Sequence, residues 1–220
     1  MSLRPNGVGS GLLGLAAFFA FSIGTAHAAV IYQVTVNTSS LNGVNGIIDL
    51  QFNPGGVTSQ AATALVTSFS GATLGNVVPP VIGPVTGTLP TDDLLFQNSA
   101  NTDYAHEILF TNSFQFRVAF DGPALTAPND GPAGTSFGLF LYDQSFSPLI
   151  TLDALIAQID INPNGTLTTT GFPIGASVAS FQIVNESPIP EPSTLTSMLL
   201  AGSALALFIR KRSAKVPRFP

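Results

Sequence analysis

The chain has 220 residues, a formal net charge of −5 and no cysteine, which excludes disulfides and thiolate metal sites. Between residues 29 and 187 lie eleven acidic residues and a single base, Arg117, so this stretch has a formal net charge of −10. A surface of that charge repels phosphate backbones, so we exclude nucleic acid as a partner, whereas divalent cations would be attracted.

The first 28 residues have the three parts of a secretory signal peptide. Arg4 is the only early charge, residues 12–23 form a short apolar stretch, and Ala26 and Ala28 occupy the small-residue positions that signal peptidase requires. We therefore expect cleavage before Ala29 and a mature chain that begins there. A retained N-terminal anchor is the alternative, but an apolar stretch of about twelve residues is short for a membrane span.

From residue 29 to residue 187 the hydrophobic pattern has a period of two, as in strands with one buried face. The clearest case runs from Phe114 to Phe120, where every second side chain is apolar. Turn sequences rich in Asn, Pro, Asp and Gly separate the segments. This pattern predicts one all-β domain, residues 29–187, folded as an antiparallel, jelly-roll-like β-sandwich. Further strands are expected at 30–36, 48–52, 62–69, 94–97, 104–110, 136–142, 155–161 and 178–184.

Other segments of this domain have weaker or mixed signals. Residues 76–90 contain Pro79 and Pro80, so we expect a long surface loop or an edge rather than a central strand. Residues 121–134 have the turn composition of a second loop. For residues 151–158 a short helix is the alternative to the strand expected from residue 155, since a threonine cap precedes apolar residues at helical spacing.

One candidate for Ca²⁺ binding lies near the end of the domain. Asp160, Asn162 and Asn164, followed by Gly165, match the start of a calcium-binding loop, in which oxygens at alternate positions surround the ion. The twelfth position is Gly171, where that loop requires a carboxylate. A plain hairpin turn without an ion is therefore the alternative.

A second candidate for Ca²⁺ binding is a group of acidic residues near the middle of the chain. Asp92 and Asp93 are adjacent, and Asp103 and Glu107 follow shortly after them. Carboxylate oxygens are ligands that Ca²⁺ prefers. These residues are candidates for a cation site, with solvated surface acids as the alternative.

A possible catalytic motif precedes one of the expected strands. Residues 134–138 match the G-x-S-x-G pattern of a nucleophile elbow, which places a serine, here Ser136, on a sharp turn between a strand and a helix. A strand pattern follows Ser136, however, and His106 precedes it, whereas that fold places the histidine after the serine. We therefore expect no catalytic residue and no enzyme. A single histidine also cannot form a multi-histidine metal site.

The C-terminal segment has three consecutive parts. A Pro-Glu-Pro tripeptide is followed by an uncharged, largely apolar run over residues 193–209 and then by a basic cluster. As a helix the run would span about 25 Å, the short end of what crosses a bilayer, with the basic cluster on the cytoplasmic side. A plain membrane anchor and a buried helix are the alternatives. The tripeptide and the cluster are Pro190, Glu191, Pro192, Arg210, Lys211 and Arg212.

In their order and position these parts, residues 188–212, resemble the PEP-CTERM sorting signal of Gram-negative bacteria that make exopolysaccharide. The tail over residues 213–220, expected in the cytoplasm, is longer than the usual ending of that signal. The resemblance implies that exosortase, a membrane protease, recognises the signal at the inner membrane and releases or transfers the passenger to the outside. The domain is also similar to short PEP-CTERM passengers with a single β-domain, a similarity that implies no activity.

These features together predict an exported protein, secreted or on the cell surface, with a transient C-terminal anchor in the inner membrane. We expect a non-enzymatic structural or adhesive component of the cell surface or of an exopolysaccharide matrix such as a biofilm. Its processing partners would be signal peptidase and exosortase. The alternative is a calcium-assisted polysaccharide-binding module, whose partner is exopolysaccharide. No cofactor is expected other than Ca²⁺ in that alternative.

Overall fold

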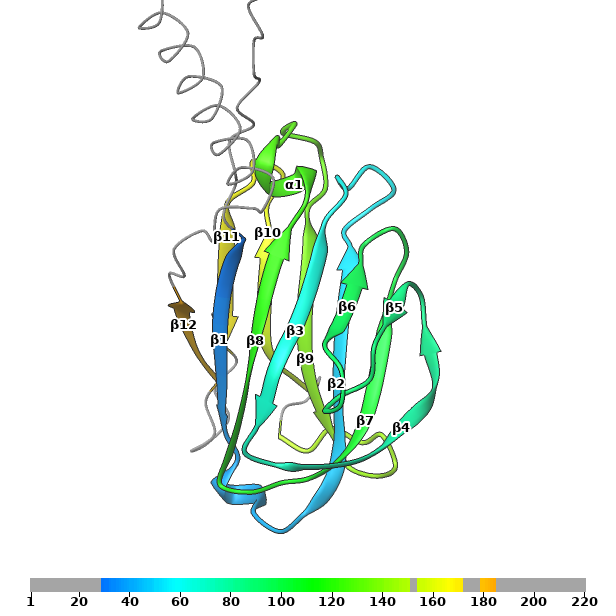
Figure 1. The fold of residues 1–220 in the computed structure, drawn as a ribbon, viewed down its shortest axis with the longest axis vertical. Coiled ribbons are helices and arrows are strands. Elements are labelled where there is room, and N and C mark those ends of the chain that lie inside the picture. Colours follow the sequence, from blue (N-terminus) through cyan, green and yellow to red (C-terminus); the bar gives the residue numbers. More distant parts are fainter. Residues whose placement is uncertain (1–28, 151–153, 172–178, 185–220) are drawn as a thin grey trace, which may run out of the picture.

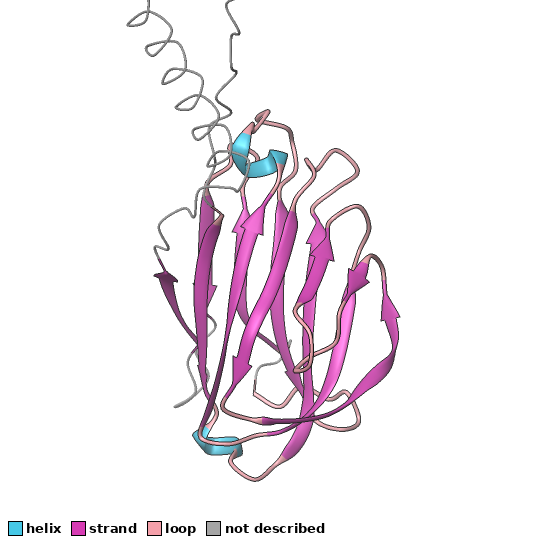
Figure 2. Ribbon diagram, viewed as in Figure 1, coloured by secondary structure: helices cyan, strands magenta, loops and turns pink. Residues whose placement is uncertain are grey.

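The computed structural model describes residues 29–150, 154–171 and 179–184. These residues form two six-stranded antiparallel sheets that pack face to face (Figure 1), which confirms the predicted all-β class. A 3-10 turn, η1 (Ser39–Leu41), and a short helix, α1 (Pro123–Thr126), lie at opposite ends of the sandwich (Figure 2). In strand order, sheet A contains β12 (Ala179–Val184), β1 (Val30–Asn37), β8 (Ser113–Asp121), β3 (Thr63–Ser70), β6 (Leu94–Gln97) and β5 (Val85–Thr86). Sheet B contains β11 (Leu167–Gly171), β10 (Leu155–Ile161), β9 (Thr135–Tyr142), β2 (Asn45–Pro54), β7 (Asp103–Leu109) and β4 (Thr73–Ile82).

Strand β8 shows how the period-two pattern becomes a two-faced strand. Its buried side chains alternate with exposed or half-buried ones along its whole length. Phe116 and Val118 point into the core, whereas Arg117 between them lies on the outer face. There the Arg117 guanidinium donates to the amide oxygen of Gln33 in β1 at 3.4 Å. Each strand of this kind therefore gives one face to the core and one to the surface.

Phenylalanine forms most of the contact between the two sheets. The ring centroid of Phe137 in β9 lies 6.2 Å from that of Phe96, 6.3 Å from that of Phe116 and 6.0 Å from that of Phe120. All four side chains are at most 2% exposed. Full burial of such a side chain stabilises a fold by roughly 1.5–3 kcal/mol. Aromatic packing between the sheets thus supplies the stability that disulfides supply in many exported domains.

A buried asparagine connects three segments beside this core. Asn98, just after β6, accepts a hydrogen bond from the backbone N–H of Ala62 at 2.8 Å. Its amide nitrogen donates to the backbone oxygen of Gln60 at 2.8 Å and to the hydroxyl of Thr135 at 2.7 Å. One side chain therefore joins the loop after β6 to the starts of β3 and β9.

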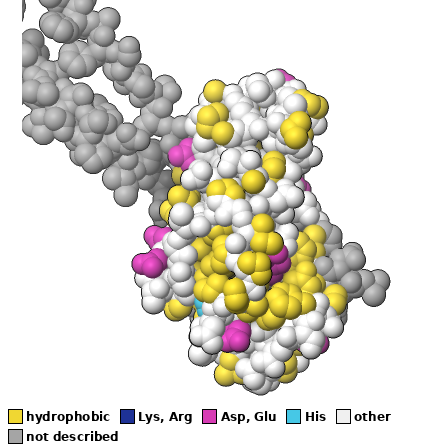
Figure 3. Space-filling view, turned by 90° about the vertical axis from the view of Figure 1, so that its right-hand side faces the viewer, with side chains coloured by type: hydrophobic (Ala, Val, Ile, Leu, Met, Phe, Trp, Pro, Cys, Tyr) yellow, Lys and Arg dark blue, Asp and Glu magenta, His cyan; other side chains and the backbone are white. Residues whose placement is uncertain are grey.

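Residues 76–90 lie at sheet edges, as the prolines predict. Strand β4 is the outer strand of sheet B and β5 that of sheet A. The pairing of β4 with β7 is interrupted between Val78 and Ile82, where Pro79 and Pro80 provide no N–H donor. Figure 3 looks onto this side, where hydrophobic side chains gather and Ile82 is 48% exposed. Prolines at such an edge oppose pairing with another chain.

The helix expected over 151–158 is wrong for the part that the structure describes, because residues 155–158 belong to β10. This strand pairs with β9 on one side and β11 on the other. A bulge between Leu155 and Ala157 places two consecutive side chains, Ile156 and Ala157, in buried positions. Because of the bulge, the buried apolar residues of this strand have a spacing along the sequence that resembles that of a helix.

Two short elements lie where the sequence predicts only loop or turn. Helix α1 falls within the loop predicted over 121–134, directly after Gly122, whose φ of 114° favours glycine. Strand β11 forms a hairpin with β10, closed by a hydrogen bond of 2.8 Å from the N–H of Asn162 to the oxygen of Thr166. Its threonine-rich sequence favours a strand but shows no apolar alternation.

The first and the last described strands are neighbours in sheet A. Strands β1 and β12 are antiparallel, with Ile31 paired to Val184. The start of β1 at Val30 and the end of β12 at Val184 therefore lie at the same end of the sandwich, on the side of α1 (Figure 1). We call this end the terminal pole, and the opposite end, with η1, the distal pole.

Candidate functional site

The outer face of sheet B has two rows of positions without apolar side chains, each crossing four strands. Strand register pairs the members of each row directly with one another. Such a surface presents amide, hydroxyl and carboxylate groups in lines that run across the strands. We call these residues the polar rows. The first row is Gln51, Gly138, Gln158 and Thr170, and the second is Asn53, Ser136, Asp160 and Thr168.

Hydrogen bonds within the polar rows fix the orientation of their side chains. The amide nitrogen of Asn53 donates to Oε1 of Gln51 at 3.0 Å. Asp160 Oδ1 accepts from the hydroxyl of Ser136 at 2.5 Å and from the amide nitrogen of Gln158 at 2.6 Å. Groups held in this way lose little conformational freedom when they bind a ligand.

Asp49 lies in β2 beside the polar rows and is only 3% exposed. Its Oδ2 accepts from the amide nitrogen of Gln51 at 2.7 Å, whereas Oδ1 has no hydrogen-bond partner among the described residues. The pKa of Asp49 is raised to about 7, first by burial and then by the negative charge of Asp103. Hydrogen bonds from Gln51 and from the backbone of Tyr104 act in the opposite direction. The structure therefore brings two carboxyls close together, and their repulsion disfavours the state in which both are ionised.

An aromatic group borders Asp49, and its first member, Phe140, packs over Gly138 of the first polar row. Phe140 is paired with Asp49 across β2 and β9, and its ring stacks on Tyr142 at a centroid distance of 6.3 Å. Phe146 lies 5.8 Å from Tyr142 and is 50% exposed. Burial raises the pKa of Tyr142, and the charges of Asp49 and Asp103 raise it further. Aromatic rings beside fixed polar groups are suited to binding sugars.

The residues predicted to start a calcium loop take part in the hairpin between β10 and β11. Asn162 donates to the hydroxyls of Thr166 and Thr168 at 3.1 and 3.5 Å. Asn164 Oδ1 accepts from the backbone N–H of Thr166 at 3.1 Å. Asp160 lies on the strand itself and already accepts two hydrogen bonds at Oδ1. The three side chains thus have separate hydrogen-bond partners that stabilise the hairpin.

The four acids of the second predicted group are distributed over two places. Asp92 and Asp93 are exposed in the loop between β5 and β6. Asp103 and Glu107 lie in β7, where Glu107 accepts hydrogen bonds from β4. Within residues 29–150, 154–171 and 179–184, no three His, Cys, Asp or Glu side chains form a group that would hold a metal ion. The structure instead pairs Asp103 with Asp49, which the sequence analysis did not select.

Ser136 and His106 lie on opposite faces of sheet B. Ser136 is within strand β9 rather than on a strand-to-helix turn, and its hydroxyl donates to Asp160. His106 in β7 is 1% exposed and faces the core. Its two ring nitrogens each lie 3.1 Å from a backbone oxygen, of Glu107 and of Leu89. This pair therefore does not have the geometry of a nucleophile and its base.

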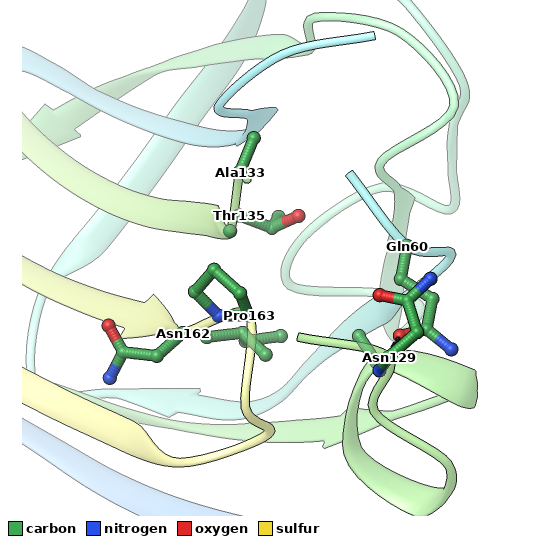
Figure 4. Close-up of a pocket in the computed structure, with 9 residues that line it drawn as sticks. Gln60, Asn129, Ala133, Thr135, Asn162 and Pro163 are labelled. Atoms are coloured by element: carbon green, nitrogen blue, oxygen red, sulfur yellow. Dashed lines mark hydrogen bonds between the residues drawn. The ribbon is translucent and has the colours of Figure 1, made fainter. Parts of the chain in front are cut away.

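Two hollows lie at the terminal pole. The smaller, of about 10 Å³, has room for about one water molecule. Figure 4 shows Gln60 and Asn129 together on one side of it, with the amide of Asn162 pointing away from them. The larger, of about 410 Å³, lies between residues 54–61 and 98–101. Neither lining includes a charged or aromatic side chain, so the face of sheet B is the better candidate site.

The predicted processing residues fall outside the described part of the chain, except for Ala29 at its start. The same holds for the predicted membrane span over 193–209. Among the residues that the structure describes, no helix has the length and apolar character needed to cross a membrane. The predicted residues outside the description are Ala26, Ala28, Pro190, Glu191, Pro192, Arg210, Lys211 and Arg212.

Comparison with protein-family models, curated proteins and solved structures found no match to this chain. Its class is therefore defined by its own architecture, an antiparallel β-sandwich with a polar, aromatic-bordered outer face on sheet B. A function must be inferred from the predicted sorting residues, the positions of the ends of the domain and the chemistry of that face.

Proposed function

We propose that this chain is an exported, non-enzymatic structural or adhesive protein of the cell surface or exopolysaccharide matrix, processed by signal peptidase and exosortase. The supporting observation is the position of both ends of the sandwich at the terminal pole. Val30 follows the expected cleavage site before Ala29, and β12 ends at Val184, a short distance before Pro190. Both junctions would then face the membrane, while the distal pole and the outer faces of the sheets point away from it.

We also infer that the first eight strands follow a jelly-roll connection. The pairs β1 with β8, β2 with β7 and β3 with β6 are those of one long hairpin rolled up on itself. Strands β9 to β11 extend sheet B beyond β2, and β12 extends sheet A beyond β1. This extension supplies three of the four strands on which the polar rows lie.

The test of export and sorting is the intact mass of the protein recovered from the medium and from the cell envelope. It is measured in wild-type cells and in cells that lack exosortase. We expect a species that starts at Ala29 and ends near residues 190–193, found only when exosortase is present. Full-length protein retained in the membrane in both strains would refute processing by exosortase.

A second candidate function is polysaccharide binding, favoured by the polar rows and the aromatic stack on sheet B. We expect Gln158→Ala to weaken retention on the host exopolysaccharide by about tenfold, the loss of about one hydrogen bond. The matched control is Gln115→Ala, on the outer face of sheet A, where the side chain donates to Ser70 at 3.3 Å. Retention is compared with and without CaCl₂. Equal retention of both variants and the wild type would exclude the polar rows as the binding surface.

A further inference from the structure

We propose that Asp49 and Asp103 form a binding site for one divalent cation, Ca²⁺, on the outer face of sheet B. The site shares Asp103 with the second predicted group of acids, but it combines Asp103 with Asp49 and includes neither Asp92 nor Asp160. It also does not depend on whether the protein is sorted, because it consists only of groups within the sandwich. The two carboxyls come from adjacent strands, β2 and β7.

Strand register places the two carboxyls within reach of each other. Asp49 is paired with Ala105, so Asp103 is its diagonal neighbour two residues along β7. Diagonal neighbours in an antiparallel pair lie close enough for side-chain contact. The charges of both carboxyls raise the pKa of Tyr142, which lies in β9 two residues after Phe140, the residue paired with Asp49.

One carboxylate oxygen of Asp49 has no hydrogen-bond partner among the described residues. Asp49 is more than nine-tenths buried, and its Oδ1 accepts no hydrogen bond from any described residue. A hydrogen bond between the carboxyls of Asp49 and Asp103 requires a proton on one of them. A buried carboxylate oxygen without a partner is costly, and a bound cation would satisfy Oδ1 and neutralise the repulsion at once.

Within the part of the chain that the structure describes, no lysine or arginine side chain lies at this site. Arg117 is the single base between residues 29 and 187, and it lies on the outer face of sheet A next to Gln33. The core of the sandwich separates it from Asp49. A proton or a metal ion from solution would neutralise the two carboxyls.

The protein supplies only two carboxylates here, so we expect Ca²⁺ to be bound weakly. Ca²⁺ takes six to eight oxygen ligands in flexible arrangements, whereas Mg²⁺ requires a near-octahedral set. Asp49 and Asp103 supply only part of that number. We expect a dissociation constant of about 10⁻⁴ to 10⁻³ M, the range of extracellular calcium modules. An ion held in this way could also bind hydroxyl or carboxylate oxygens of a polysaccharide.

The test is thermal unfolding and calorimetric titration of the purified full-length chain at pH 8. Unfolding is compared in about 10 mM CaCl₂ and in NaCl of equal ionic strength, because salt alone screens repulsion. We expect CaCl₂ to raise Tm by about 3–6 °C and the titration to give one site per chain. At pH 5 protons compete for the carboxyls, so the effect should shrink.

Two variants distinguish this site from other acidic residues. Asp49→Asn should abolish the response to CaCl₂ but remain folded, because its amide nitrogen can donate to Asp103. Asp160→Asn, on the same face, should keep the response, since its Oδ1 still accepts from Ser136 and Gln158. The proposal would be overturned if the wild type had the same Tm in CaCl₂ and in NaCl. It would also be overturned if CaCl₂ raised the Tm of Asp49→Asn as much as that of the wild type. The remaining interpretation would be a carboxyl pair that shares a proton.

Discussion

The raised pKa of Asp49 predicts that the stability of the sandwich depends on pH. Its pKa of about 7 in the folded state exceeds the ordinary value of 3.8, so the folded state binds the proton more tightly than the unfolded state. This stabilisation is complete below about pH 4 and is lost as the pH rises through 7, at up to about 1.4 kcal/mol for each pH unit. Stability should therefore fall toward neutral pH.

We predict that the free energy of unfolding decreases from pH 5 to pH 8 by a few kcal/mol in the wild type and by much less in Asp49→Asn. The measurement is urea denaturation with a chelator present. Asp143→Asn is the control, because that carboxyl caps an exposed loop through Ser145 and Ser147. The same decrease in Asp49→Asn as in the wild type would show that another group causes it.

The sequence contains only a weak signal for the carboxyl pair. Asp49 interrupts an apolar run between Ile48 and Leu50, which marks it as unusual for a strand that lies inside a sheet. Its partner depends on the register of β2 against β7, which no local pattern specifies. Asp103 was selected only as a neighbour of Asp92 and Asp93, and these lie elsewhere. Spacing along the sequence therefore does not predict pairs of side chains that meet across two strands.

At the scale of elements, Asn98 is the polar residue on which several segments depend. We predict that Asn98→Ala lowers the free energy of unfolding by about 1–3 kcal/mol, because it leaves buried backbone groups of Gln60 and Ala62 without a partner. Asn101→Ala is the matched control, an exposed residue of the same loop, and should change stability by at most about 0.5 kcal/mol. Urea denaturation measures both. Equal effects of the two variants would contradict this role.

Strands were predictable where one face is buried and the other is polar. Strand β8 meets this condition along its whole length, so its alternation is visible in the sequence. Strand β10 has a bulge at residues 155–157, and the bulge shifts the apolar positions into a helix-like order. Strand β11 lies at an edge with mostly exposed threonines, so nothing in its hydrophobic pattern marks it. The helix alternative at β10 was thus wrong and β11 was missed, because neither strand has one buried and one polar face along its whole length.

At the scale of the molecule, the cohesion of the two sheets depends on rings near the centre. We predict that Phe137→Ala lowers the free energy of unfolding by about 3–5 kcal/mol, because Phe137 contacts three rings from two strands of the other sheet, β6 and β8. Phe146→Ala removes an exposed ring and should cost at most about 0.5 kcal/mol. Equilibrium unfolding in urea gives both values. If Phe137→Ala lowered the free energy of unfolding only slightly, the contacts that hold the two sheets together would not centre on Phe137.

The sequence predicted the class of the fold but not its strand order. Composition, periodicity and turn residues together specify about ten half-buried strands, and these must pair into sheets that bury their apolar faces. Which strands become neighbours depends on contacts between distant segments, such as β1 with β8 and β12. The common position of the two ends follows from that order. It was therefore available only from the structure.

The neighbouring positions of β1 and β12 also determine how the domain responds to mechanical force. A pull between Val30 and Val184 acts on the same end of both strands, so their six residue pairs separate one after another at low load. A pull between Val184 and the distal pole acts along the strands and loads all six pairs together. We therefore expect the sandwich to resist less force when it is pulled apart at Val30 and Val184 than when it is held at Val184 and pulled at its distal pole, which is the direction of load that the proposed adhesive role would impose.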